Sequence, residues 1–334
     1  MGSDKQHGPR SSRRSRPPDG VQTPPSPAPA DDERAGQGGQ AVPDNRSQWL
    51  PIVVDNKIEE FEPVPPDIRP YRPDTVCDGW SSEQMTVRMA SVRGYLHRYN
   101  GTPRQDDADL GFDADTGAVV FAVADGLSSA SHAHLGATAA CRAAVEAILR
   151  DLGPAQAGPD WPGVMDAAAS AVTARAGRHL GRPVSQDEVE DLMATTLVAG
   201  YLRPSDGGLA GSVAAVGDSS AWLHRAGSYK PVLAVKESEN LVSSAVSPLP
   251  RTPESLDSVP VRLDADSVLL IGTDGFGDPL GDGDGMIGQL FTSYLVMPPP
   301  PDEFAHLLDF SRETFDDDRT LIAIWPRSGQ PGRR

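Results

Sequence analysis

The sequence has few cysteines and no long hydrophobic run. Its 334 residues include only two cysteines, Cys77 and Cys141, which excludes a disulfide framework and a Cys-x-x-Cys zinc or redox motif. No apolar stretch approaches the roughly 20 residues that cross a bilayer. The N-terminal arginines are followed by prolines rather than by the apolar segment of a signal peptide. These absences predict a cytoplasmic protein that does not act at a membrane.

The sequence also lacks a basic excess. It holds 30 Lys and Arg against 47 Asp and Glu, a formal net charge of -17. Proteins that bind nucleic acids neutralise phosphates with a positive surface, so this balance argues against a nucleic-acid partner. An acidic chain is better suited to cationic partners or metal ions.

Proline content and apolar periodicity divide the chain into four parts. A disordered tail rich in Pro, Arg and Ser is predicted over 1–47, because this composition buries too little apolar surface to offset the entropy of ordering. Residues 48–85 are a proline-rich linker, a short strand pairing onto the domain, or a segment that docks a partner. A single domain is predicted over 86–327, and 328–334 form a polar tail.

Within the domain, apolar runs predict strands and amphipathic stretches predict helices. Strands are predicted at 118–124, 196–202, 212–216, 221–224, 231–235, 267–273 and 320–325. Helices are predicted at 131–150, 164–180, 288–295 and 301–314. Strands that follow one another directly, with helices grouped early and late, indicate an α+β layered sandwich rather than an alternating βαβ chain.

Several predicted strands end or begin on a carboxylate. The first strand stops at Asp125-Gly126, two later strands stop at Asp218 and Asp274, and Asp317 precedes the last strand. Each aspartate taken alone is more typical of a turn. Four together, with an acidic stretch at 105–109, favour a cluster that a cation must neutralise. Oxygen ligands without Cys or His favour Mg²⁺ or Mn²⁺ over Zn²⁺.

Six short motifs occur in order along residues 90–325. They are Arg104-Gln105-Asp106-Asp107, Val123-Ala124-Asp125-Gly126, Ala194-Thr195-Thr196-Leu197, Val216-Gly217-Asp218-Ser219, Gly272-Thr273-Asp274-Gly275 and Asp317-Asp318-Arg319-Thr320. The series resembles bacterial metal-dependent protein phosphatases of the PPM or 2C type. Members of that family carry Asn-Glu/Gln-Asp, apolar-Asp-Gly, Thr-Thr-apolar, apolar-Gly-Asp-Ser, apolar-Ser/Thr-Asp-Gly and Asp-Asn-x-Thr in this order.

The resemblance implies a fold and a metal site. The fold is a β-sandwich of two antiparallel sheets flanked by helices, in four αββα layers. Asp125 would bridge two Mn²⁺ or Mg²⁺ ions, with the Gly126 carbonyl on one of them. Asp274 and Asp317 would complete the first ion, and Asp106 or Asp107 would hold the second, directly or through water. Asp218 would contribute to a weaker third position beside Asp274.

The resemblance also implies an activity. A water bound between the two ions would attack the phosphorus of phosphoserine or phosphothreonine in line, without a covalent phosphoenzyme. The substrate would be a phosphoprotein, and the enzyme would counteract a serine/threonine kinase. Cys141 falls on the apolar face of the first predicted helix and is expected in the core.

This sequence departs from the family pattern around the first motif. Gln105 replaces the Glu of many members and is a weaker ligand, or else the register shifts by one and Asp106 and Asp107 form the pair. The Arg that binds substrate phosphate could be any of three before the motif, of which Arg104 is preferred over Arg93 and Arg98. His97 is the most interesting candidate for a general acid, while His132 and His134 are better explained as residues at the start of a helix.

Gln105 also motivates an alternative function. A catalytically weak or inactive pseudophosphatase could use the same fold to bind a phosphoprotein or to act as a scaffold. The intact Asp125, Asp274 and Asp317 argue against this alternative.

Overall fold

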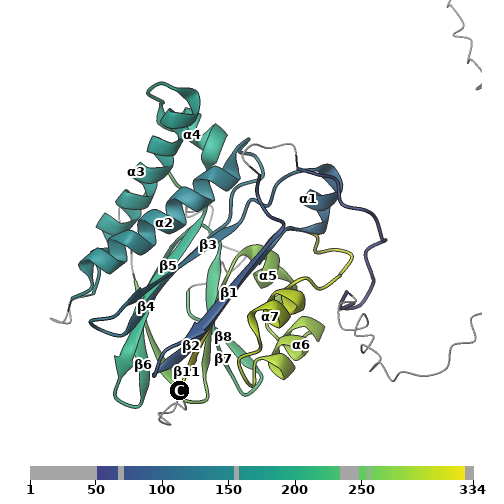
Figure 1. Ribbon diagram of the computed structural model, residues 1–334, viewed down its shortest axis with the longest axis vertical. Helices are drawn as coiled ribbons and strands as arrows, with labels where there is room; N and C mark the ends of the chain where they lie inside the picture. The colour runs from purple at the N-terminus through teal and green to yellow at the C-terminus, as the bar shows by residue number, and fades with distance from the viewer. Residues whose placement is uncertain are drawn as a thin grey trace, which may run out of the picture. The chain divides into compact units, whose positions relative to one another are not determined.

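Two antiparallel β-sheets pack face to face and carry helices on their outer faces (Figure 1). The computed structural model describes residues 51–66, 71–153, 158–233, 248–253, 256 and 258–327. These residues belong to one structural unit, Arg46–Arg334. The predicted tails at 1–47 and 328–334 lie outside the described residues.

Each sheet brings together strands that are distant in the sequence. The first sheet has six strands in the order β1 (Thr75–Ser81), β2 (Met85–Val92), β11 (Arg319–Pro326), β10 (Val268–Gly272), β7 (Ser220–Arg225) and β8 (Ser228–Pro231). The second has five in the order β3 (Asp107–Asp113), β4 (Ala118–Ala124), β5 (Leu197–Ser205), β6 (Gly208–Val216) and β9 (Val259–Asp264). All neighbouring strands pair antiparallel.

Helices cover both outer faces of the sandwich. The second sheet is covered by α2 (Ala133–Asp151), α3 (Trp161–Leu180) and α4 (Gln186–Met193), whose apolar residues form one core cluster with the sheet. The first is covered by α5 (Asp274–Leu280), α6 (Met286–Tyr294) and α7 (Pro301–Leu308). A short helix, α1 (Tyr95–Asn100), follows β2. The predicted four-layer αββα architecture of two antiparallel sheets is therefore confirmed.

Strand β4 shows why its sequence is continuously apolar. Val119, Phe121 and Val123 face the core between the sheets. The alternate residues, including Val120 and Ala122, pack beneath α2 and α3. Since side chains alternate between the two faces of a strand, a strand buried on both faces needs apolar residues at every position. This central strand places Asp125 at its end.

Part of the segment 48–85 belongs to the first sheet. Strand β1 pairs with β2, so a strand pairing onto the domain occurs here. Further upstream, Val54 is buried and its N–H donates to the carbonyl of Ser311 over 2.9 Å. Cys77 is an exposed residue of β1, and Cys141 is buried on α2 as expected. Within the described residues, no helix combines the length and apolarity needed to cross a bilayer.

Candidate metal centre

Four carboxylates line one cavity of about 200 Å³ at an edge of the sandwich. They are those of Asp125, Asp218, Asp274 and Asp317. The first two follow β4 and β6 of the second sheet, while the other two lie after β10 and before β11 of the first. Antiparallel pairing brings these strand ends to a common edge, so rigid backbone from both sheets holds the four acids together. Gln105 and Gly126 also line the cavity.

The adjacent threonines Thr195 and Thr196 fix the turn that carries Asp125. The Thr195 hydroxyl and the Thr196 N–H each donate to the Asp125 carbonyl over 2.8 Å. The Asp125 N–H donates in turn to the Thr196 hydroxyl over 3.0 Å. That hydroxyl lies 2.7 Å from the hydroxyl of Ser219, the neighbour of Asp218. The Thr-Thr motif therefore ties two acidic turns together, a role that the motif order alone does not reveal.

Asp106 lies buried behind the cavity, with only 1% of its surface exposed. The Thr273 hydroxyl donates to its carboxylate over 2.8 Å. The same hydroxyl accepts the N–H of Thr320 over 3.1 Å. Because Thr273 precedes Asp274, this network couples the position of Asp106 to the start of α5 and to strand β11.

Asp318 is a second buried acid, for which the sequence predicted no role. Its carboxylate accepts the N–H groups of Gly94 over 2.6 Å and Gln105 over 2.5 Å. The Nδ1 atom of His97 lies 2.9 Å from the Asp318 carboxylate. Asp318 thereby joins the residues before β3 to the turn that carries Asp317. Asp318 could have been identified from its place in the last motif, where it replaces the Asn of the family pattern.

Close backbone packing holds the same turn. An added Cβ at Gly94 would lie 2.2 Å from the carbonyl carbon of Asp317. One at Gly275 would lie 1.9 Å from the Asp318 carbonyl oxygen. No side chain fits at such distances, so both glycines are needed for the acidic turn to reach the cavity.

Burial and mutual repulsion dominate the electrostatics of the cluster. Burial and then the charges of Asp106 and Asp274 raise the pKa of Asp125 well above its usual range. Burial and the Asp318 charge also raise the pKa values of Asp106 and Asp317. A cation would stabilise the ionised forms of these acids. The side-chain atoms that would bind it are all oxygens, the ligand atoms that Mg²⁺ and Mn²⁺ prefer.

Asp318 and His97 behave in the opposite way. Burial disfavours the charged form of each, but their mutual contact outweighs it. The pKa of Asp318 is lowered, helped by the N–H groups of Gly94 and Gln105. The pKa of His97 is raised by Asp318 and Asp317. The two form a buried ion pair next to the carboxylate cavity.

The two members of the first acidic pair lie in different surroundings. Asp106 joins the buried cluster. Asp107 begins β3 and does not line the cavity; its carboxylate lies 3.4 Å from Arg72 and is hydrogen-bonded to the Thr138 hydroxyl. The structure therefore groups Asp106, and not Asp107, with the other predicted ligands.

The candidate arginines and His97 do not line the cavity. Arg104 is only 2% exposed and its nearest carboxylate is that of Asp107, at 3.9 Å. Arg93 donates to the carbonyls of Thr102 and His97, and Arg98 pairs with Asp309. His132 precedes α2 and His134 lies in its first turn, consistent with residues that start a helix.

The chain matches one family of known sequences and a set of solved structures. The family model described as protein phosphatase 2C matches residues 93–308. No curated protein sequence matches the chain. Among solved structures, a bacterial serine phosphatase aligns with a TM-score of 0.52 at 14% identity, covering 74% of this chain and 99% of that one. The catalytic domain of the phosphatase PstP, solved with two manganese ions, aligns with a TM-score of 0.48 at 17% identity, covering 73% and 99%.

Proposed function

The chain belongs to the protein phosphatase 2C family, and from this premise we propose that it hydrolyses phosphoserine and phosphothreonine in proteins with the help of two Mn²⁺ or Mg²⁺ ions. One observation carries the proposal. The carboxylates of Asp125, Asp218, Asp274 and Asp317 arrive from four different strand ends and line the same small cavity. Four acids gathered in this way repel one another unless cations are placed among them.

The proposed ligand set follows the positions of the acids. Asp125 is proposed to serve both ions, with the Gly126 carbonyl on one. Asp274 and Asp317 would hold the first ion, Asp106 would support the second directly or through water, and Asp218 would contribute to a weaker third position. Gln105 lines the cavity and offers a neutral amide oxygen where a charged ligand is common.

The ions would supply an activated water and neutralise charge on the phosphoryl oxygens. The protein's own contribution is to hold the acids in place. Thr195 and Thr196 orient Asp125 through its backbone. The N–H of Asp318 donates to the carboxylate of Asp317 over 2.8 Å, which fixes that ligand.

His97 and Arg104 are proposed to act on this site from behind the cavity. His97 keeps Asp318 ionised and oriented, and Asp318 in turn orients Asp317. Arg104 places a buried positive charge near Asp106 and Asp318 and favours their ionised forms. The predicted roles of His97 as a proton donor and of Arg104 as a phosphate ligand remain predictions. Either role would require the side chain to reach the substrate, and neither residue is in the described lining of the cavity.

The partner in this proposal is a phosphoprotein, and the enzyme opposes a serine/threonine kinase. The test is hydrolysis of p-nitrophenyl phosphate and of a phosphothreonine peptide by the full chain, with Mn²⁺ and with a chelator. The variant Asp274→Asn removes one proposed ligand. Asp115→Asn is its matched control, because Asp115 is exposed in the turn between β3 and β4.

We expect turnover with Mn²⁺ by the natural chain and the control, and a loss of roughly 10²-fold or more in chelator or with Asp274→Asn. Full activity in chelator would rule out the metal mechanism. Absence of turnover by folded protein that binds Mn²⁺ would favour the pseudophosphatase alternative.

A further inference from the structure

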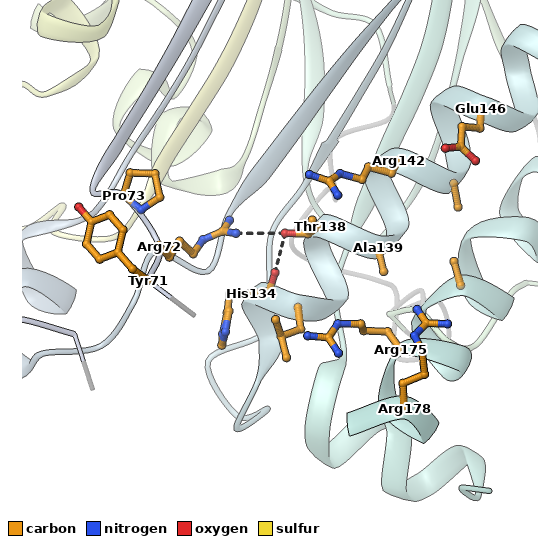
Figure 2. A pocket seen from close by; sticks show the side chains of 13 residues that line it. Tyr71, Arg72, Pro73, His134, Thr138, Ala139, Arg142, Glu146, Arg175 and Arg178 are labelled. Atoms are coloured by element: carbon orange, nitrogen blue, oxygen red, sulfur yellow. Dashed lines mark hydrogen bonds between the residues drawn. The ribbon is translucent and has the colours of Figure 1, made fainter. Parts of the chain in front are cut away.

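A basic groove lies on the helical side of the second sheet (Figure 2). It runs between residues 71–73 and the helices α2 and α3, and its volume is about 630 Å³. This is within the range of ligand pockets, roughly 300–1,000 Å³. Its lining shares no residue with the carboxylate cavity. The groove is therefore a separate feature of the molecule.

The charge of the groove is opposite to that of the chain. Four arginines line it, Arg72, Arg142, Arg175 and Arg178, with Glu146 as the one carboxylate in the described lining. The chain as a whole carries a net charge of -17. Figure 2 shows Arg72 from the segment before β1, Arg142 from α2, and Arg175 and Arg178 from α3 around one space. Such a concentration of positive charge in an acidic protein favours an anionic occupant.

Three of these arginines are free to pair with a ligand. Among the residues that the structure describes, Arg142, Arg175 and Arg178 form no ion pair. Arg175 and Arg178 are three residues apart on α3, so they lie on the same face of the helix. The positive field also reaches His134, where burial and the charge of Arg72 lower the pKa to about 4. His134 is therefore neutral at pH 7 and adds no charge to the groove.

The floor between the arginines is apolar. Leu135, Ala139 and Ala143 of α2 face Ala171 of α3, and Tyr71 and Pro73 close one end. Spread positive charges over an apolar floor suit a peptide that carries both carboxylates and aliphatic side chains. A nucleic acid would extend beyond the groove along a chain whose net charge is -17, which disfavours phosphate contacts. The charge pattern thus favours a peptide occupant.

Arg72 connects the groove to the carboxylate cluster. Its guanidinium donates to the Thr138 hydroxyl over 3.0 Å and to the backbone carbonyl of Asp106 over 2.5 Å. One side chain therefore separates the groove from the loop that carries a proposed metal ligand. A protein bound in the groove would consequently lie next to the loop that carries Asp106.

We propose that this groove binds an acidic, aliphatic-containing segment of a partner protein through Arg175 and Arg178. The site is additional to the carboxylate cavity and needs neither metal nor turnover. A substrate that carries such a segment would dock there while its phosphorylated residue reaches the cavity, a consequence that rests on the proposed phosphatase function.

Binding is measured directly by fluorescence anisotropy on the full chain with Mn²⁺ present. The probe is a labelled, unphosphorylated peptide of about ten residues in which glutamates alternate with leucine and alanine. The test variant is Arg175→Glu with Arg178→Glu. The control is Arg150→Glu with Arg262→Glu, which changes the net charge equally at exposed positions outside the groove. Arg150 and Arg178 both lie in the last turn of a helix, so their effects on the helix dipole are matched.

We expect the test variant to weaken binding roughly tenfold or more and the control less than about twofold. A peptide with lysines in place of the glutamates is expected to bind the test variant better than the natural chain. Equal binding of the acidic peptide to all three proteins would overturn the proposal. Tighter binding of a single-stranded oligonucleotide, lost in the same variant, would replace the peptide with a nucleic acid.

Catalysis is followed separately with p-nitrophenyl phosphate, which is too small to reach both sites. All three proteins are expected to hydrolyse it equally, and thermal unfolding checks that each is folded. Failure of the groove proposal would leave this rate unchanged. Failure of the phosphatase proposal would abolish the rate and leave peptide binding intact.

Discussion

Replacing Asp274 by asparagine is expected to have opposite effects on stability with and without metal. In chelator the variant should be more stable than the natural chain, because Asp274 adds a negative charge beside Asp125 and raises the pKa of that buried acid. In Mn²⁺ the natural chain should gain stability and the variant should not. The perturbation therefore distinguishes a metal-binding cluster from acids that merely occupy turns.

The expected magnitudes follow from charge and mass action. Two carboxylates about 4 Å apart repel by ~4 kcal/mol at an effective dielectric of about 20. One of the two acids can bind a proton and so relieve part of this repulsion, so the free energy of unfolding of the variant in chelator should exceed that of the natural chain by only about 1–2 kcal/mol. Saturating metal at about 100 times its Kd stabilises the natural chain by ~2.7 kcal/mol. For a domain of this size each kcal/mol corresponds to roughly 2–4 °C in Tm. The Mn²⁺-dependent rise should thus be roughly 5–10 °C.

The assay is thermal unfolding by circular dichroism at pH 7.5, in chelator and in a Mn²⁺ series. Asp115→Asn serves as the control for loss of one charge at an exposed position. It should follow the natural chain in both conditions. A Tm that does not respond to Mn²⁺ in the natural chain, or an equal response in Asp274→Asn, would refute the reasoning.

Three further predictions concern neighbouring residues. Asp106→Asn should lower kcat for a phosphopeptide by roughly 10²-fold. Asp107→Asn should lower it less than about threefold, because the Asp107 carboxylate pairs with Arg72. Steady-state kinetics of the two variants tests this difference. The pKa of His134 is about 4 in the folded protein, against an ordinary value of 6.5. Between pH 6.5 and pH 4, His134 is therefore protonated in the unfolded chain but neutral in the folded one. The free energy of unfolding should therefore fall by up to about 2 kcal/mol as the pH drops from 7 to 4, and urea titrations should show a smaller fall in His134→Gln. Gly275→Ala should destabilise the protein by about 1–3 kcal/mol in the same urea assay, because its Cβ would meet the Asp318 carbonyl oxygen; an unchanged midpoint would contradict that packing argument.

The parts of the fold with strong apolar patterns could be predicted from the sequence. Strand β4 matches its prediction at both ends, since its run of seven apolar residues is bounded by turn residues. The first two long helices and the last strand were also identified, with ends displaced by a few residues. The helix predicted at 301–314 ends at Leu308 instead, and residues 309–314 form irregular structure.

Other elements carry weak local signals. Strand β1 is largely exposed, so its residues show no apolar alternation. Strand β3 begins with Asp-Ala-Asp and resembles an acidic loop, although its position beside β4 makes it a strand. Helix α4 has a capping box at Ser185 and Glu188 that could have identified it. Tertiary pairing, rather than local pattern, determines β1 and β3.

The candidate site shows the same division. The strand-end aspartates could be predicted because each follows or precedes a strongly apolar run. The choice between Asp106 and Asp107 could not, because Asp106 directly precedes β3 and Asp107 begins it. Side chains of adjacent residues in an extended segment point to opposite sides, and the sequence does not show which side meets the cluster. Asp318 and its contact with His97 depend on a pairing of residues more than 200 positions apart.

The most direct measurement of the central claim is an anomalous scattering map at the manganese edge from crystals grown with Mn²⁺. We predict two strong peaks in the cavity, both within coordination distance of the Asp125 carboxylate, one of them also contacting Asp274 and Asp317. A cavity without peaks, or manganese bound only at Asp107 or elsewhere on the surface, would contradict the claim that these strand-end aspartates form a metal centre.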